Sequence, residues 1–233
     1  MATFVLVPGA GGQAWYWHRL TPLLERLGHQ VLAIELPAGE ESAGIGEYAD
    51  LVVRAIGERR PIVLVAQSLA GFSAPLVCER VPVELLVLLN AMVPCPGETA
   101  GDWWANTGQA AARAAFAVQQ SRPVRDEVDI WQDFFHDVPP EVTAEAQAAG
   151  PTPQSGKVFG QRWPLDHWPD VPTRFLQARD DRFFPLEFQR RVVGERLGLP
   201  VDEIAGGHLV ALSQPEALAA RLDAYWTELH TVS

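Results

Sequence analysis

The sequence predicts an α/β fold, in which a mostly parallel, doubly wound sheet carries helices on both faces. Short apolar runs rich in Val, Leu and Ile recur along the chain, each bounded by Gly, Pro or charge, and helical patterns lie between them. Continuous apolar runs of this length are typical of parallel strands that are buried on both sides. Their alternation with helices favours a single open sheet.

The predicted strands are residues 3–7, 31–35, 61–66, 83–89 and 173–178. Helices are expected between them. Thr21-Pro22 is a cap followed by a first-turn proline, and Gly28 ends that helix. Residues 45–56 place apolar side chains on one helical stripe, and the capping box that begins at Ser213 opens a last helix to about Leu229.

One segment breaks the alternation. Residues 94–168 show no clear strand, and a structureless loop of this length would be unusual in a compact domain. We therefore expect a helical cap inserted between two parts of the core, residues 1–93 and 169–233. The insertion is rich in aromatic residues, which either line a binding site or pack the cap onto the core.

Composition limits the partners. The chain has 233 residues, 48% of them hydrophobic, and a net charge of −11, which disfavours nucleic acid and anionic membranes. No apolar stretch reaches the roughly 18 residues of a membrane span, so a soluble, cytoplasmic protein is expected. Cys78 and Cys95 lack a metal-ligand spacing. The oligomeric state stays open, and a homodimer is compatible with the sequence.

Ser68 is the predicted nucleophile. It follows an apolar strand and is flanked by Ala66 and Ala70, where the usual G-x-S-x-G pattern has glycines. Small residues are needed there because the turn from strand to helix is so tight that larger side chains would meet the backbone. A structural serine turn is the alternative interpretation of this motif alone.

A serine nucleophile needs a base and an acid that orients the base. His208 follows Gly206-Gly207 just before the last helix, and we expect it to be the base. Asp180 and Asp181 both come directly after a predicted strand, and Asp181 is the preferred acid because the Arg182-Phe183-Phe184-Pro185 that follows it matches the usual context of the acid. The order Ser, Asp, His along the chain is that of α/β-hydrolases.

The loop after the first strand is the expected oxyanion hole. It is rich in glycine from Gly9 to Gly12, and we expect the N–H groups of Ala10 and Leu69 to be the two donors. A G-x-G-G run also occurs in phosphate-binding loops, but no Lys-Ser/Thr follows it here, which disfavours nucleotide binding.

Together these motifs resemble the α/β-hydrolase superfamily, and within it the small plant-type methylesterase and hydroxynitrile-lyase group. The likeness is carried by residues 5–12 with Trp15-Tyr16-Trp17, by the Ser68 turn, by residues 181–185 and by residues 207–209. It implies an α/β-hydrolase fold with a helical cap, no cofactor and a small-molecule substrate.

Departures from the group bear on the chemistry. Pro8 and Gln67 stand where the family that this chain resembles usually has histidines. The lyase branch looks to need a threonine near the oxyanion loop and a lysine directly after the catalytic histidine, and here those positions hold Gly9 and Leu209. Ester hydrolysis is therefore preferred over cyanohydrin cleavage. A carboxylesterase for a small, largely apolar ester is expected. A lyase, a C–C hydrolase, a perhydrolase and a small-molecule receptor with little turnover remain alternatives. The aromatic residues expected to bind substrate are Trp15, Trp104, Trp131, Phe134 and Trp163.

Overall fold

The computed structural model describes residues 1–231. Its centre is a six-stranded sheet in which every pairing is parallel, with the strand order β2-β1-β3-β4-β5-β6. The strands are β1 (Thr3–Val7), β2 (Gln30–Ala33), β3 (Ile62–Gln67), β4 (Leu85–Leu89), β5 (Thr173–Ala178) and β6 (Val201–Ile204). The predicted parallel, doubly wound sheet is therefore confirmed.

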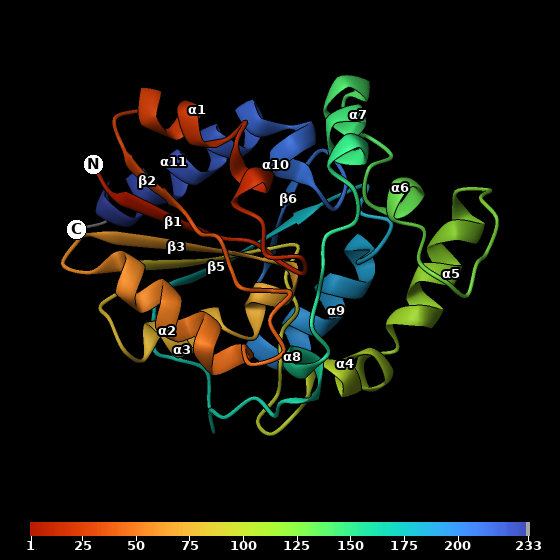
Figure 1. The fold of residues 1–233 in the computed structure, drawn as a ribbon, viewed down its shortest axis with the longest axis horizontal. Helices are drawn as coiled ribbons and strands as arrows, with labels where there is room; N and C mark the ends of the chain where they lie inside the picture. The colour runs from red at the N-terminus through yellow and green to blue at the C-terminus, as the bar shows by residue number, and fades with distance from the viewer. Residues whose placement is uncertain (232–233) are drawn as a thin grey trace.

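Helices cover both faces of this sheet (Figure 1). The helices outside the segment between β4 and β5 are η1 (Ala14–Trp17), α1 (Thr21–Arg26), α2 (Ile45–Ile56), η2 (Ser68–Gly71), α3 (Ala74–Cys78), α9 (Leu186–Leu197), α10 (Val210–Ser213) and α11 (Pro215–Thr231). Side chains alternate along each strand: Val5 and Leu64 pack on the side of α2, α3 and α9, whereas Phe4 and Val63 pack on the side of α1 and α11. This alternation explains why the strands are apolar throughout.

The strand order reverses between β1 and β3. From β1 the chain first goes to β2 at one edge, and then returns to place β3 on the other side of β1. In open α/β sheets, ligands bind outside the carboxyl ends of the strands at such a switch point. The loop after β1 and the turn after β3 meet there.

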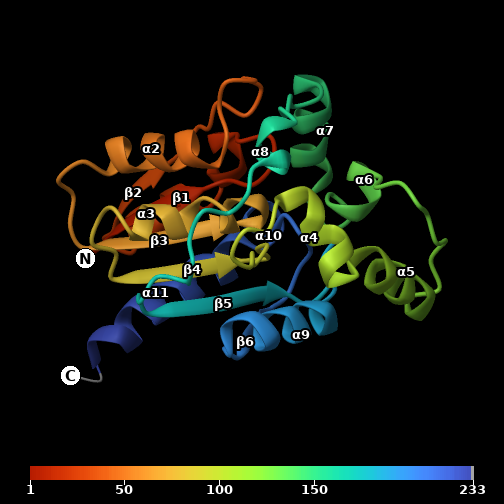
Figure 2. The same cartoon turned by 90° about the horizontal axis from the view of Figure 1, so that it is seen from below.

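The segment between β4 and β5 contains helices and a single isolated bridge, Thr99 with Arg162. Its helices are α4 (Ala100–Thr107), α5 (Gln109–Gln119), α6 (Ile130–Asp133), α7 (Pro140–Ala149) and α8 (Lys157–Gly160). Figures 1 and 2 show α4 to α7 at the end of the sheet away from the two termini. We call residues 94–168 the cap segment; its division from the core as a separate unit stays a prediction.

The cap segment is joined to the core by buried tryptophans. Trp103 and Trp163 are almost fully buried in the same cluster as the strands and α9. The Nε1 of Trp103 donates to the Val93 carbonyl at 3.0 Å, and that of Trp163 to the Phe72 carbonyl at 3.1 Å. Buried indole N–H groups need such partners, so these contacts fix where the base of the cap segment lies.

Several predicted boundaries differ from the structure. The strand expected at 83–89 begins two residues later, at Leu85, and those expected at 31–35 and 61–66 are shifted by one or two residues. The proposed cap at Ser213 is wrong: this residue ends α10, its Oγ has no hydrogen-bond partner within residues 1–231, and α11 begins at Pro215. The local chain makes two helices there because Gln214 leaves the helical conformation.

None of the helices within the described residues has the length and the apolar character required to cross a lipid bilayer.

Candidate active site

Ser68 lies in a strained turn. β3 ends at Gln67, and the chain enters the short 3-10 helix η2 with Ser68 at a φ of 54°, a left-handed conformation that is uncommon outside glycine. The expected helix does not run on directly: η2 is followed by α3 at Ala74. The turn leaves no room for a side chain at Gly71, where a Cβ would lie 1.9 Å from the carbonyl oxygen of Met92.

The structure brings the three predicted triad residues together. The His208 Nε2 lies 3.1 Å from the Ser68 Oγ, and the His208 Nδ1 lies 2.8 Å from the Asp181 Oδ2. All three side chains are buried, with at most 7% of any residue exposed. They come from the carboxyl ends of β3, β5 and β6, which explains how residues so distant in the sequence meet.

The two adjacent aspartates are separated by the structure. Asp181 is completely buried, whereas Asp180 is exposed and its backbone N–H donates to the Gly206 carbonyl at 2.9 Å. The Asp181 Oδ1 accepts from the backbone N–H groups of Phe183 and Phe184 at 2.8 and 2.9 Å. Its Oδ2 also accepts from Gln177 Nε2 at 3.2 Å. These donors orient the carboxylate toward the imidazole.

Aromatic rings enclose the imidazole of His208. The ring of Phe134 lies 4.9 Å away, and those of Phe183 and Phe184 lie 5.2 Å away, edge to face. Burial also raises the pKa of the nearby Tyr16 above its usual value, so this phenol stays neutral. The rings restrict water around the histidine and strengthen its interaction with Asp181.

The loop after β1 is fixed by hydrogen bonds on either side of Ala10. The Gly9 N–H donates to Gln67 Oε1 at 2.9 Å, and the Gly11 N–H donates to Gln154 Oε1 at 2.8 Å. Within residues 1–231, neither Ala10 nor Leu69 donates its backbone N–H to a protein acceptor. Both predicted oxyanion donors therefore remain available, although their role stays a prediction.

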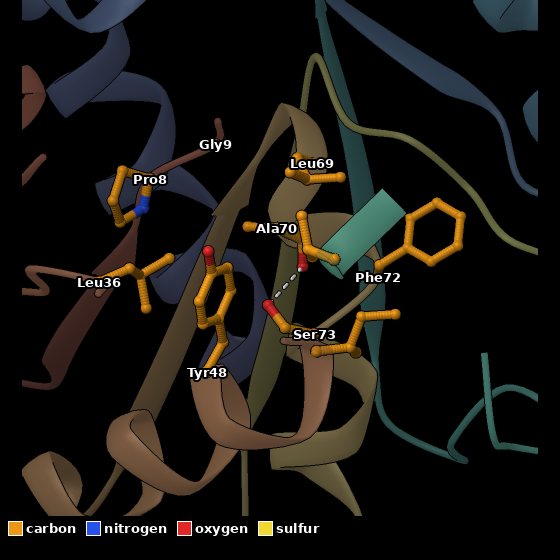
Figure 3. A pocket seen from close by; sticks show the side chains of 10 residues that line it. Pro8, Gly9, Leu36, Tyr48, Leu69, Ala70, Phe72 and Ser73 are labelled. Carbon is orange, nitrogen blue, oxygen red and sulfur yellow. Dashed lines mark hydrogen bonds between the residues drawn. The ribbon is translucent and has the colours of Figure 1, made fainter. Parts of the chain in front are cut away.

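A small, mostly apolar pocket adjoins the nucleophile turn (Figure 3). It is bounded by the loop after β1, by α2 and by the turn after β3. Its lining residues are Pro8, Gly9, Leu36, Ile45, Tyr48, Leu69, Ala70, Phe72, Ser73 and Val158. The polar groups of Tyr48 and Ser73 lie among apolar side chains, and Ser73 Oγ donates to the Ala70 carbonyl at 3.4 Å.

The five aromatic residues expected to bind substrate lie in different surroundings. Phe134 packs on His208, and Trp104 packs on Phe183 at 5.4 Å, so these two belong to the rings around the triad.

The other three make other contacts. Trp163 is buried in the core and packs on Trp168. Trp131 is 42% exposed and packs on Phe135, and Trp15 donates from Nε1 to Glu145 at 2.9 Å. No ring contact with His208 exists for these three within the described residues, and their role in binding stays a prediction.

The sequence interpretation missed polar residues that contact the three candidate triad residues or their loops. Asn90 follows β4 and is completely buried, and Gln177 near the end of β5 contacts Asp181. Asp137 of the cap segment accepts from the Gly207 N–H at 2.6 Å, directly before His208. A polar side chain at the carboxyl end of a buried strand was the available signal for Asn90 and Gln177, whereas no local pattern marks Asp137.

Comparison with known proteins indicates the same fold. A model described as the alpha/beta hydrolase family matches residues 4–221. An alpha-hydroxynitrile lyase of Arabidopsis thaliana is 25% identical, with 97% of each chain covered. A probable esterase of Oryza sativa is 26% identical over 92% of this chain and 93% of the rice protein. A crystal structure of polyneuridine aldehyde esterase superposes with a TM-score of 0.77 at 23% identity, covering 97% of this chain and 99% of that one.

Proposed function

Because the chain belongs to the alpha/beta hydrolase family, an enzyme family with esterases among this chain's relatives, we propose that it is a serine carboxylesterase acting on a small, largely apolar ester. The observation that carries this proposal is the continuous hydrogen-bonded series from Asp181 through His208 to Ser68. A buried serine within reach of an oriented imidazole is the arrangement that acyl transfer requires.

The first half of the reaction acylates the enzyme. Asp181 accepts the Nδ1 proton of His208 in a hydrogen bond, which leaves Nε2 free to remove the proton of Ser68 Oγ. The oxygen attacks the ester carbonyl, and the N–H groups of Ala10 and Leu69 stabilise the oxyanion. His208 then gives its proton to the leaving alkoxide, and an acyl-enzyme remains.

The second half returns the enzyme to its starting state. A water molecule gives a proton to His208 Nε2 and attacks the acyl carbonyl, passing through a second oxyanion in the same position. Collapse of this intermediate returns the proton to Ser68 Oγ and releases the carboxylic acid.

The surroundings of Ser68 support an apolar substrate. The pocket beside Leu69 is lined mainly by aliphatic and aromatic groups, Phe134 packs on His208, and Trp104 packs on Phe183. Such walls stabilise apolar groups by removing their surface from water. We expect kcat/KM for p-nitrophenyl esters to exceed that for esters with charged acyl groups; a preference for charged acyl groups would contradict this assignment.

The decisive experiment compares Ser68→Ala with Ser42→Ala, a substitution of an exposed loop serine. Ser68→Ala should lose about 10³-fold or more of its p-nitrophenyl acetate turnover. It should also lose labelling by a fluorophosphonate while keeping its thermal unfolding transition. Ser42→Ala should retain both the p-nitrophenyl acetate turnover and the fluorophosphonate labelling. Undiminished turnover by a folded Ser68→Ala protein would exclude the proposal.

The same preparation separates hydrolysis from the other chemistries of this family. Release of an aldehyde and cyanide from a cyanohydrin, without ester turnover, would indicate a lyase, which the Arabidopsis relative makes the natural comparison. Fluorophosphonate labelling and small-molecule binding without turnover would indicate a receptor. Gly9 and Leu209 stand where the lyase branch looks to need a threonine and a lysine, and their absence favours the esterase.

A further inference from the structure

The cap segment contains a second pocket, lined by basic side chains. Its walls are Arg113, Ala114 and Ala117 of α5, Arg122, Pro123 and Arg125 of the following loop, and Asp133 of α6. Asp133 is the one carboxylate among these lining residues, all of which belong to the described part of the chain. Three arginines and one aspartate thus line the pocket, and one further carboxylate, Asp129, pairs with Arg125, in a protein whose net charge is −11.

Arg113 forms the rigid wall of this pocket. It is only 9% exposed, and its Nη2 donates to the carbonyl oxygens of Arg125 and Asp126 at 2.9 and 2.7 Å. Its Nη1 donates to the Glu127 carbonyl at 3.2 Å and to Asp133 Oδ2 at 3.4 Å. Asp133 Oδ2 also accepts from the Asp129 N–H at 3.0 Å, so this carboxylate already has two donors within the fold.

Arg122 has a buried donor without an acceptor. Its Nε donates to Gln120 Oε1 at 2.7 Å, but its Nη2 is buried and has no partner within residues 1–231. The Nε of the neighbouring Arg182 is likewise buried and unpartnered in the described structure. An unsatisfied buried donor is destabilising, and more so when it is charged.

The surroundings of Arg122 also crowd positive charge. Burial, and then the charge of Arg182, lower the pKa of the Arg122 guanidinium below its usual value, with Arg125 and Arg113 adding to the effect against the opposing Asp133. Arg125 donates from Nη2 to Gln132 Oε1 at 2.7 Å and forms an ion pair with Asp129 at 3.8 Å near the surface. The site therefore has positive charge and donors in excess of its acceptors.

We propose that a small oxyanion with two negative charges, such as a phosphate or a dicarboxylate, binds at the solvent-facing side of this pocket. Arg122 and Arg125 would donate to the anion, while Arg113 fixes the wall on which it rests. Planar guanidinium groups bind such oxygens through paired, charge-assisted hydrogen bonds. The site is separate from Ser68, and the proposal does not depend on the esterase assignment.

The test measures thermal unfolding of the full chain against inorganic phosphate and succinate, with sodium chloride at the same ionic strength as the reference. A saturable rise in Tm is expected with phosphate or succinate and not with chloride, because ligands that bind the folded state stabilise it. Arg122→Gln should weaken the affinity by about tenfold or more. Arg54→Gln, which changes an exposed arginine of α2, should bind like the unmodified protein.

Arg125→Gln supplies a second variant should Arg122→Gln not fold, since Arg125 is exposed and its own side chain supports little of the core. The same loss of affinity is expected for it. Equal Tm values in chloride, phosphate and succinate would overturn the proposal, and so would unchanged phosphate affinity in a folded Arg122→Gln protein. A response to phosphate without succinate would identify phosphate as the class of ligand.

Discussion

The side-chain amide of Asn90 donates to the backbone carbonyl of His208 at 3.1 Å. Its Nδ2 also lies 3.3 Å from the Gly207 carbonyl, and its Oδ1 accepts from the Ala178 N–H at 2.7 Å. Asn90 is completely buried at the end of β4 and has a φ of 45°, which asparagine tolerates better than most residues. One side chain therefore holds the loop of the proposed base to the strand that precedes the proposed acid.

Asn90→Gly should lower kcat far more than it changes KM. Glycine accepts the left-handed backbone but removes the amide, so the loop that carries His208 is no longer fixed relative to Ser68. We expect kcat to fall by about tenfold or more, since small misplacements of a catalytic group are costly. The measurement is steady-state hydrolysis of p-nitrophenyl esters, normalised to the fluorophosphonate-labelled fraction.

A folded Asn90→Gly protein with unchanged kcat would show that Asn90 is structural only. The free energy of unfolding should also fall by about 2–4 kcal/mol, because buried backbone groups lose their partner. This loss of stability alone does not separate the two roles, whereas the split between kcat and KM does.

Asp181→Asn and Asp180→Asn form a matched pair. The buried Asp181 contacts His208 at 2.8 Å, whereas the side chain of Asp180 is exposed, so the same chemical change is made at two adjacent positions. Asp181→Asn should reduce kcat/KM by about 10³–10⁴-fold, because an amide favours the wrong tautomer of the histidine. Asp180→Asn should stay within a few fold. Equal effects at both positions would contradict the assignment of the acid.

The sheet could be predicted because most of its strands have a continuous apolar pattern that is visible in the local sequence. The runs at Thr3–Val7 and Thr173–Ala178 coincide with β1 and β5, and Ile45–Ile56 coincides with α2. In each case burial on a fixed set of faces imposes the apolar pattern. The short strand β6, Val201–Ile204, was not assigned, because two of its residues are acidic and its pattern is weak.

The three candidate triad residues could be selected from the sequence because Ser68 and Asp181 follow predicted strands and His208 follows a glycine pair, in the order Ser, Asp, His; the structure brings them within hydrogen-bond distance, and their catalytic role stays a prediction. The residues that support them could not be selected, since Asn90 and Asp137 act through backbone groups of a loop that is distant in the sequence. Likewise, Trp163 and Phe134 look alike in the sequence. Only tertiary packing separates a core tryptophan from a ring against His208.

Gly71→Ala and Gly194→Ala should change stability in opposite directions. A Cβ on Gly71 would lie 1.9 Å from the Met92 carbonyl oxygen, and both groups are buried backbone that cannot move aside cheaply. Overpacking of this kind costs about 1–3 kcal/mol or more. A Cβ on Gly194, exposed in the last turn of α9, meets nothing within 4 Å and should add up to about 1 kcal/mol through helix propensity.

Urea unfolding of both variants measures this difference, and Gly71→Ala should lose ester turnover as well because Ser68 lies in the same turn. A Gly71→Ala protein as stable as the unmodified chain would mean that the turn after β3 is looser than the structure indicates. Gly194→Ala serves as the control, since its effect is confined to the helix.

Acid should destabilise the protein partly through His136. Burial lowers the pKa of this histidine below its usual value of 6.5, against the opposing charge of Asp137 and with the help of Arg182. The unfolded chain therefore takes up this proton at a higher pH than the folded chain does. The free energy of unfolding should fall as the pH drops below about 6.5, and the loss is complete once the pH passes the lower, folded-state pKa.

Urea unfolding between pH 7.5 and about 5 measures this dependence of the free energy of unfolding on pH. His136→Gln should make it shallower, whereas His230→Gln, in the exposed last turn of α11, should leave it nearly unchanged. An identical slope in the His136→Gln protein would assign the acid sensitivity to other groups.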